Sequence, residues 1–168
     1  MIFRFTAKLR RRLKVPDRQL VEPTPRTAPS EWYGNVVILR RRHFLIFTEA
    51  TTLFTAWAPA AEVTSPAAVS TVFRNYVVRA LNAERYDGDA STRVLDAGED
   101  VFARARDPRV LGSMMDFINM VRFHLDDSGL DQVPIARMND IANESPMSLI
   151  GMAPRDALAR LLRPKRAR

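Results

Sequence analysis

Residues 32–57 read WYGNVVILRRRHFLIFTEATTLFTAW, and this stretch carries the strongest secondary-structure signal in the chain. It contains three runs rich in β-branched and aromatic residues, at 32–40, 43–47 and 51–57. Short polar connections at Arg41–Arg42 and Glu49–Ala50 separate the runs, and connections of this length are typical of hairpins. The stretch therefore predicts an antiparallel β-meander.

The segment that precedes the meander predicts a strand, a helix and then a loop. Residues 1–5 have the composition of a strand, and Thr6 can cap a helix that runs to about Lys14. The apolar stripe of this helix consists of Phe5, Leu9 and Leu13. Four prolines within 16–31 block both helix and sheet hydrogen bonding, so this segment is expected to be a surface loop.

The segment that follows the meander is mainly helical in pattern. Helices are expected over 66–82, 91–98, 108–127, 133–142 and 155–162, with one further strand within 99–106. The fold class is therefore α+β: an antiparallel β-meander with an N-terminal strand and helix, packed against several helices. We expect one compact domain over 1–162, with a proline-rich loop at 16–31 and a basic tail at 163–168.

The composition excludes several kinds of site. The chain of 168 residues has no cysteine, which removes disulfides, thiolate zinc sites and cysteine nucleophiles. Its six glycines are never closely spaced, so neither a P-loop nor a dinucleotide-binding fingerprint can be built. No apolar run approaches the ~20 residues of a membrane span, and the start of the chain lacks the pattern of a secretory signal. We expect a cytoplasmic protein with no cofactor, no bound metal and no membrane contact.

Positive charge is concentrated in the first part of the chain. The net charge is +7, and the clusters Lys8–Lys14, Arg40–His43 and Arg163–Arg168 can converge on one surface. The candidate basic patch is Arg10, Arg11, Arg12, Arg40, Arg41 and Arg42. Its expected partner is an acidic protein or a nucleic acid. The alternative is a solvated helix face, a hairpin tip and a frayed tail, with an arginine excess that reflects codon bias.

Two further groups of residues stand out. On the long helix, Asp116 and Asn119 share a face with Phe123, which suggests that both sides of the helix are covered and that the polar groups need partners. The alternative is an exposed face. The cluster Trp32-Tyr33-Gly34-Asn35 can line a pocket or seal the end of a core. His43 and His124 are read as structural histidines.

Ordered motifs along the chain resemble an uncharacterised prokaryotic family, the domain of unknown function DUF6933. They are Ile2-x-x-x-Thr6-x-Lys8-Leu9, Trp32-Tyr33-x-Asn35, Leu45-x-Phe47-Thr48 with Thr52-Leu53-Phe54, Val110-Leu111-Gly112-Ser113-Met114-x-Asp116-Phe117 and Asn143-Glu144-Ser145-Pro146-Met147. The resemblance implies a single α+β domain and assigns no activity or ligand. With Asn119 added from the helix pattern, the candidate functional site is Thr6, Lys8, Trp32, Asn35, Asp116, Asn119, Asn143 and Glu144.

The first interpretation of function is a binding or interaction module with a basic surface, since no recognised catalytic motif is present. One alternative is a small RNA-directed hydrolase or nuclease with Lys8 as electrostatic stabiliser, Asp116 as base and His124 as acid. Another is a purely structural accessory domain. A functional site would require Lys8, Asn35 and Asp116 to lie on elements that meet across one core.

Overall fold

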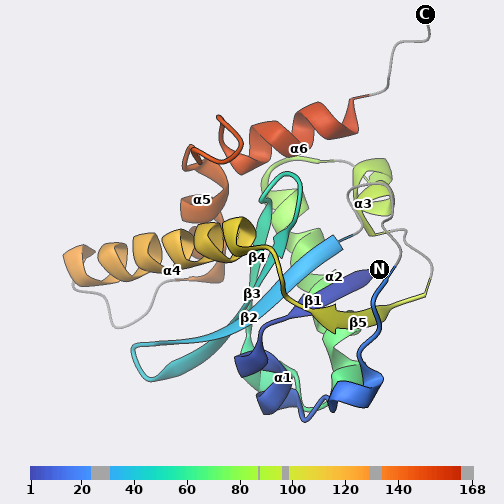
Figure 1. The fold of residues 1–168 in the computed structure, drawn as a ribbon. Helices are drawn as coiled ribbons and strands as arrows, with labels where there is room; N and C mark the ends of the chain where they lie inside the picture. The colour runs from blue at the N-terminus through green and yellow to red at the C-terminus, as the bar shows by residue number, and fades with distance from the viewer. Residues whose placement is uncertain (24–30, 87, 96–98, 129–133, 164–168) are drawn as a thin grey trace, which may run out of the picture.

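The computed structural model describes residues 1–23, 31–86, 88–95, 99–128 and 134–163, and its centre is a five-stranded mixed sheet (Figure 1). The strands are β1 (Ile2–Phe5), β2 (Glu31–Leu39), β3 (Arg42–Glu49), β4 (Thr55–Pro59) and β5 (Val101–Arg104), in the spatial order β4-β3-β2-β1-β5. Strands β2, β3 and β4 pair antiparallel, whereas β1 pairs parallel with both β2 and β5.

The α+β class is confirmed, but the sheet is mixed rather than purely antiparallel, because β1 and β5 join it in parallel. A parallel pair cannot be joined by a tight turn, because the chain must return to the end of the sheet from which it started. Helix α1 (Ala7–Leu13) and the residues that follow it provide this return between β1 and β2. The part of the proline-rich loop at 24–30 lies outside the described residues, as do 96–98 and the end of the basic tail at 164–168.

The helices begin and end close to where the sequence pattern places them. They are α2 (Pro66–Ala83), α3 (Gly88–Leu95), α4 (Pro108–Ser128), α5 (Ile135–Glu144) and α6 (Pro154–Leu162), with short 3-10 helices η1 (Asp17–Gln19) and η2 (Ala60–Glu62). Thr6 caps α1 by accepting a hydrogen bond from the backbone N–H of Leu9, and Ser65 caps α2 in the same way through Ala68. The predicted Thr6 cap is thus confirmed.

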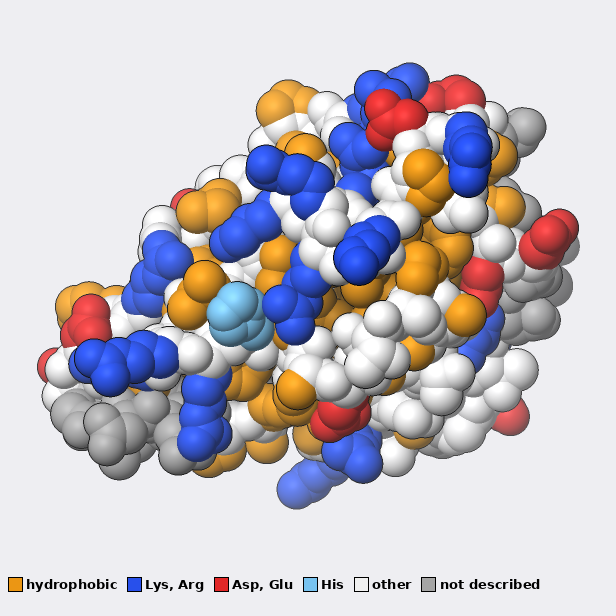
Figure 2. All heavy atoms as spheres, turned by 90° about the horizontal axis from the view of Figure 1, so that it is seen from below, with side chains coloured by type: hydrophobic (Ala, Val, Ile, Leu, Met, Phe, Trp, Pro, Cys, Tyr) orange, Lys and Arg blue, Asp and Glu red, His pale blue; other side chains and the backbone are white. Residues whose placement is uncertain are grey.

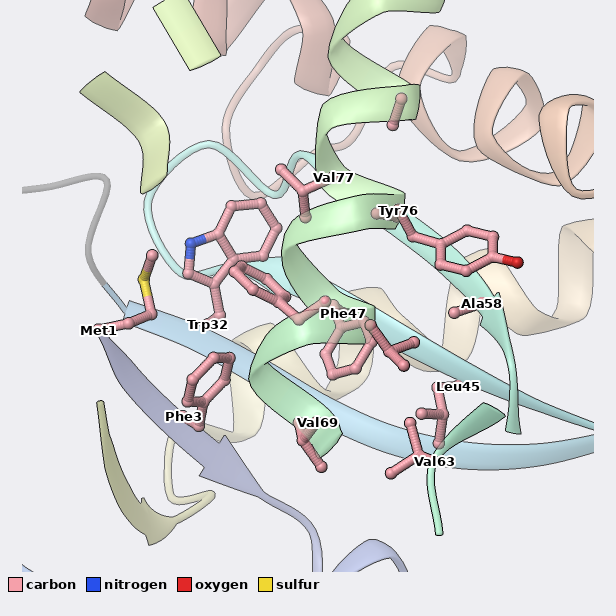
Figure 3. Close-up of a cluster of buried hydrophobic side chains, with 14 of the residues drawn as sticks. Met1, Phe3, Trp32, Leu45, Phe47, Ala58, Val63, Val69, Tyr76 and Val77 are labelled. Atoms are coloured by element: carbon pink, nitrogen blue, oxygen red, sulfur yellow. The ribbon is translucent and has the colours of Figure 1, made fainter. Parts of the chain in front are cut away.

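Two hydrophobic cores lie on the two faces of the sheet. Alternation along β2 directs Trp32 and Val36 to the face covered by α2, and Tyr33 and Val37 to the face covered by α4. Under α2, aromatic rings from β1, β2 and β3 surround Phe73, and the Trp32 ring meets it edge-on at 4.9 Å between centroids. Figure 3 shows Val69 and Val77 of α2 in the same cluster as the strand residues Phe3, Trp32 and Phe47.

The strand predicted at 51–57 begins later, at Thr55. The reason lies in Glu49, whose buried carboxylate accepts hydrogen bonds from the backbone N–H groups of Thr51 and Thr52. These bonds hold the residues after β3 in a turn, where Leu53 adopts a positive φ of 60°. The expected sheet connection at Glu49–Ala50 is therefore a longer turn that ends at the start of β4.

Helix α5 closes the exposed edge of β4 with two amide side chains. Asn143 accepts from the backbone N–H of Thr55 and donates to its carbonyl, both at 2.8 Å, and Asn139 accepts from the N–H of Trp57 at 2.9 Å. The two asparagines are one helical turn apart and both are buried. They occupy the place of a further strand, which removes a free edge from the sheet.

Candidate functional site

The turn between β2 and β3 presents two arginines in a conformation that arginine rarely adopts. Leu39 pairs with Arg42, so Arg40 and Arg41 alone form the loop, and their φ angles are 44° and 64°. Two-residue hairpin turns with positive φ at both positions favour Asn-Gly, since a side chain with a Cβ is strained there. The tip of this hairpin projects from the body of the molecule (Figure 1).

A cavity of about 710 Å³ lies at the sheet edge, beside the point where β3 begins and β4 ends. It is lined by Arg12, Arg42, His43, Phe44, Pro59, Ala61, Pro134 and Ile135. The cationic members come from α1 and β3, whereas the apolar members come from β3, β4, η2 and the start of α5. The cavity therefore combines a basic side with an apolar side.

Arg12 is held in place by two contacts within this site. Its Nη2 donates to the carbonyl of Ala60 at 3.2 Å, and its Nη1 lies 3.2 Å from Nδ1 of His43. A guanidinium can only donate, so this contact requires Nδ1 of His43 to accept and places the ring proton on Nε2. His43 thus offers an N–H donor on the far side of its ring.

The acidic residues of the first part of the chain are used elsewhere. Four arginines on β1, on α1 and at the end of β5 pair with Asp17, Glu22 and Glu31; they are Arg4, Arg10, Arg104 and Arg106. On the outer face of α1, Lys8 and Arg11 are exposed, as is Arg41 at the hairpin tip. Within the part of the chain that the structure describes, no ion pair is found for these three cations.

The result is a face with an excess of positive charge. Figure 2 shows the molecule from the side of α1, where Lys and Arg side chains form a band around a histidine with hydrophobic side chains exposed between them. We define the basic surface as Lys8, Arg11, Arg12, Arg41, Arg42 and His43. Residues 8, 11 and 12 share one face of α1, because residues three and four positions apart are neighbours on a helix.

The structure separates the six arginines of the predicted basic patch. Arg12 and Arg42 line the same cavity, and Arg11 and Arg41 are exposed. Arg10, in contrast, pairs with Asp17 and is only 17% exposed. At the hairpin, Arg40 pairs with Asp126 of α4 at 2.7 Å.

Of the other candidate residues, Thr6 and Asn35 are brought together. The Thr6 hydroxyl donates to Oδ1 of Asn35 at 2.8 Å while it caps α1, which ties the start of this helix to β2. Trp32 is fully buried in the core under α2, so it seals that core. Lys8 is exposed on α1, away from this hydrogen bond.

The expectation that Asp116 and Asn119 are desolvated was wrong. Both are exposed on α4, and Phe123 on the same helix is 73% exposed. The sequence pattern correctly finds the buried stripe of α4, which faces the sheet, but nothing described covers the opposite side. Lys8, Asn35 and Asp116 consequently do not meet across one core, because α1 and α4 contribute to the two separate cores.

The last two candidates lie on α5 and have different surroundings. Asn143 is buried and closes the edge of β4, which is a structural role. Glu144 is half exposed and pairs with Arg155 at 2.7 Å. The sequence pattern missed Phe44, Pro59 and Ile135 as cavity residues, because their shared position depends on how β3, β4 and α5 meet. The basic clusters Lys8–Lys14 and Arg40–His43 were the sequence signals for this site.

Other kinds of site find little support in the described ranges. Among these residues there is no group of three or more histidine, aspartate or glutamate side chains that could hold a metal ion. The same residues contain no helix with the length and apolar character that crossing a bilayer requires.

Comparison with known protein families gives a match over most of the chain. A family model described as "Domain of unknown function (DUF6933)" matches residues 2–157. No curated protein matches the chain.

Proposed function

Because the chain belongs to the DUF6933 family, whose description gives no activity, we propose from its own surface that it is a binding module for a phosphate-bearing polymer, a single-stranded nucleic acid. One observation carries the proposal: cations from α1 and from the β2–β3 hairpin converge on one cavity, with no acidic residue among the described residues that line it. Such a surface attracts polyanions over a distance of several ångströms and holds them by direct contact.

The chemistry of the surface favours phosphate over a carboxylate-rich peptide. Arginine supplies most of its charge, and its planar guanidinium pairs bidentately with phosphate and carboxylate oxygens alike, so the distinction rests on the rest of the cavity. The cavity also has an apolar side that includes Phe44, and an aromatic ring beside cations is the usual arrangement for stacking an unpaired base. An acidic peptide would leave this apolar side without a partner.

The strained hairpin turn gives independent support. Non-glycine residues with positive φ cost free energy and are concentrated at functional sites. Arg40 and Arg41 place charge where Asn-Gly would relieve the strain. Arg40 pairs with Asp126, so the charge that this strained turn offers to a ligand is that of Arg41.

The hydrolase alternative has less support. It requires Lys8 to act together with Asp116 and His124, but α1 and α4 contribute to cores on opposite faces of the sheet. A base on one layer and a stabilising cation on the other do not form a common site.

The test is a titration of a fluorescently labelled single-stranded oligonucleotide with the full chain over a range of salt concentrations. Affinity should fall steeply with salt, with a slope of about −0.7 for each phosphate contact on a single strand. The double variant Arg11→Gln/Arg41→Gln should weaken binding and flatten the slope. Both side chains are exposed, so the fold should be retained.

The matched control is Arg160→Gln/Arg163→Gln, which removes the same charge from exposed positions at the end of α6. An equal loss of binding in both double variants would show a general effect of net charge and would contradict the proposed surface. No binding at low salt, a flat salt response or tighter binding of a polyglutamate peptide would refute the nucleic-acid proposal.

A further inference from the structure

We propose that the cavity between α1 and the start of α5 binds one nucleotide unit, with its phosphate on Arg12 and Arg42 and its base against Phe44. This inference rests on the proposed function and names the chemical group that the cavity takes. The rest of the basic surface would then contact the backbone of a longer strand, whereas the cavity would hold a single nucleoside phosphate.

The cationic side of the cavity is prepared for an anion. Contacts to Ala60 and His43 fix the position of the Arg12 guanidinium, so little side-chain entropy remains to be lost when a ligand binds. Of its five N–H groups, those not used in these contacts remain available to an oxygen acceptor. The Nε2 proton that the Arg12 contact assigns to His43 adds a neutral donor at the same cavity.

The apolar side of the cavity fits a ring system. Phe44, Pro59 and Ile135 form this side, and Ala61 adds only a methyl group. A volume of about 710 Å³ lies within the range of small-molecule sites, which is ~300–1,000 Å³. Inorganic phosphate would satisfy the cations but would leave this apolar side and most of the volume unfilled. A phosphate ester that carries a base uses both sides.

Two sources can supply this chemistry: a free nucleotide, or the phosphorylated end of a nucleic-acid strand. Both present a phosphate with a high negative charge on a nucleoside. An internal nucleotide is different, because its phosphates are diesters and the chain continues on both sides. Binding of adenosine 5′-monophosphate, and of one oligonucleotide with and without a 5′-phosphate, separates these sources.

The first experiment titrates the full chain with adenosine 5′-monophosphate and follows the imidazole signals by NMR. The chain has two histidines, His43 at the cavity and His124 on α4, so one reports the site and the other is an internal control. The nucleotide should shift the His43 signals and leave those of His124 unchanged. Adenosine and inorganic phosphate should each bind at least about tenfold more weakly than the nucleotide, because each lacks one half of the contacts.

The second experiment fills the cavity without changing its charge. Ala61 is exposed at the edge of the site, so Ala61→Trp should occupy the volume while the fold is retained. The variant should lose nucleotide binding by about tenfold or more. The control is Ala67→Trp, at an exposed alanine in the first turn of α2 that does not line the cavity. Arg42→Gln should also weaken nucleotide binding, whereas Arg160→Gln should not.

The outcomes separate this inference from the proposed function. If the oligonucleotide binds with the expected salt dependence but adenosine 5′-monophosphate does not shift His43, the cavity inference is overturned and the proposed function stands. Equal nucleotide affinity in Ala61→Trp and Ala67→Trp would also overturn it. If the 5′-phosphate tightens oligonucleotide binding and Ala61→Trp abolishes this gain in affinity, the cavity binds the end of a strand. If the oligonucleotide binds equally well with and without the 5′-phosphate while adenosine 5′-monophosphate binds tightly, the cavity binds a free nucleotide.

Discussion

Glu49 combines complete burial with an incomplete set of hydrogen bonds. Its Oε2 accepts from two backbone N–H groups and from the Thr52 hydroxyl, whereas its Oε1 is buried and finds no partner among the described residues. Burial raises the pKa of the Glu49 carboxyl above its usual range, although the hydrogen bonds oppose this shift. The folded state therefore holds a proton on this residue more tightly than the unfolded state does.

We predict that Glu49→Gln makes stability less dependent on pH. A raised pKa in the folded state stabilises the fold at pH values below the unfolded pKa, and this contribution is lost as the pH rises through the folded pKa. The variant has no proton to lose, so the stability of the wild type should fall relative to the variant from about pH 4.5 upward. Urea midpoints of both proteins at several pH values measure this difference.

The control is Asp116→Asn, which makes the same carboxyl-to-amide change at an exposed position on α4. This variant should remain folded, and it measures how a carboxyl-to-amide change at an exposed position affects the pH dependence of stability. A difference between wild type and Glu49→Gln that stays constant with pH would contradict the role given to burial.

Asn143 is the residue for which we predict the largest loss of stability among the candidate polar residues. Asn143→Ala leaves the N–H and the carbonyl of Thr55 without partners in a buried place, and each such group costs about 1–3 kcal/mol. The matched control is Asn119→Ala on the exposed face of α4, where a change within about 0.5 kcal/mol is expected. Urea unfolding measures both. Equal free energies of unfolding would show that water replaces the Asn143 contacts.

Among the elements, the β2–β3 hairpin carries two charged residues in a turn where their positive φ angles reduce stability. We predict that Arg40→Asn/Arg41→Gly stabilises the fold by about 1–2 kcal/mol, because the new residues adopt positive φ with less strain. Loss of the exposed Arg40–Asp126 pair subtracts little from this gain, since surface pairs contribute under about 1 kcal/mol. The same variant should bind the oligonucleotide more weakly. Thermal unfolding and the binding titration measure the two effects.

Arg40→Lys/Arg41→Lys is the control for this hairpin. It keeps both the charge and the strained turn, so neither stability nor binding should change greatly. If the Asn-Gly variant is less stable than the wild type, contacts of the two arginines stabilise the turn by more than their backbone strain costs, and the prediction is wrong.

The sequence pattern finds elements well and their pairing less well. Local signals such as the Thr6 cap and the apolar spacing of α2 are sufficient to place helices, because they act within a few residues. The parallel pairing of β1 depends on contacts far along the chain, to β2 and β5, and no local spacing encodes it. The start of β4 was missed because the buried Glu49 carboxylate captures the preceding N–H groups.

The same limit applies to the candidate site. The Arg40–His43 cluster is visible in the sequence, but its meeting with Arg12 depends on the packing of α1 against the sheet. The helix pattern that nominated Asp116 shows apolar residues on both sides of α4 and cannot tell which side is covered. The spacing of Asn139 and Asn143 by one turn was the available signal for the helix that closes the sheet edge.

For the molecule as a whole, the sheet is the structure that the two cores share. Each strand of the antiparallel part contributes residues to both faces, for example Phe47 to the core under α2 and Ile46 to the core under α4. Neither core can unfold without disrupting the strands against which its helices pack. We therefore propose that residues 1–162 unfold as one domain.

Two tryptophans allow this proposal to be tested core by core. Trp32 is buried in the core under α2 and Trp57 in the core under α4, so Trp57→Phe and Trp32→Phe each leave one reporter. We predict that Phe117→Ala, which opens a cavity in the Trp57 core, lowers the urea midpoint reported by Trp32 in the Trp57→Phe background. The free energy of unfolding should fall by about 3–5 kcal/mol, the usual cost of removing a buried phenylalanine side chain. Because the strands couple the two cores, fluorescence and far-ultraviolet circular dichroism should give the same midpoint in every variant. A Trp32 transition that stays unchanged when Phe117 is removed would show two cores that unfold separately on a common sheet.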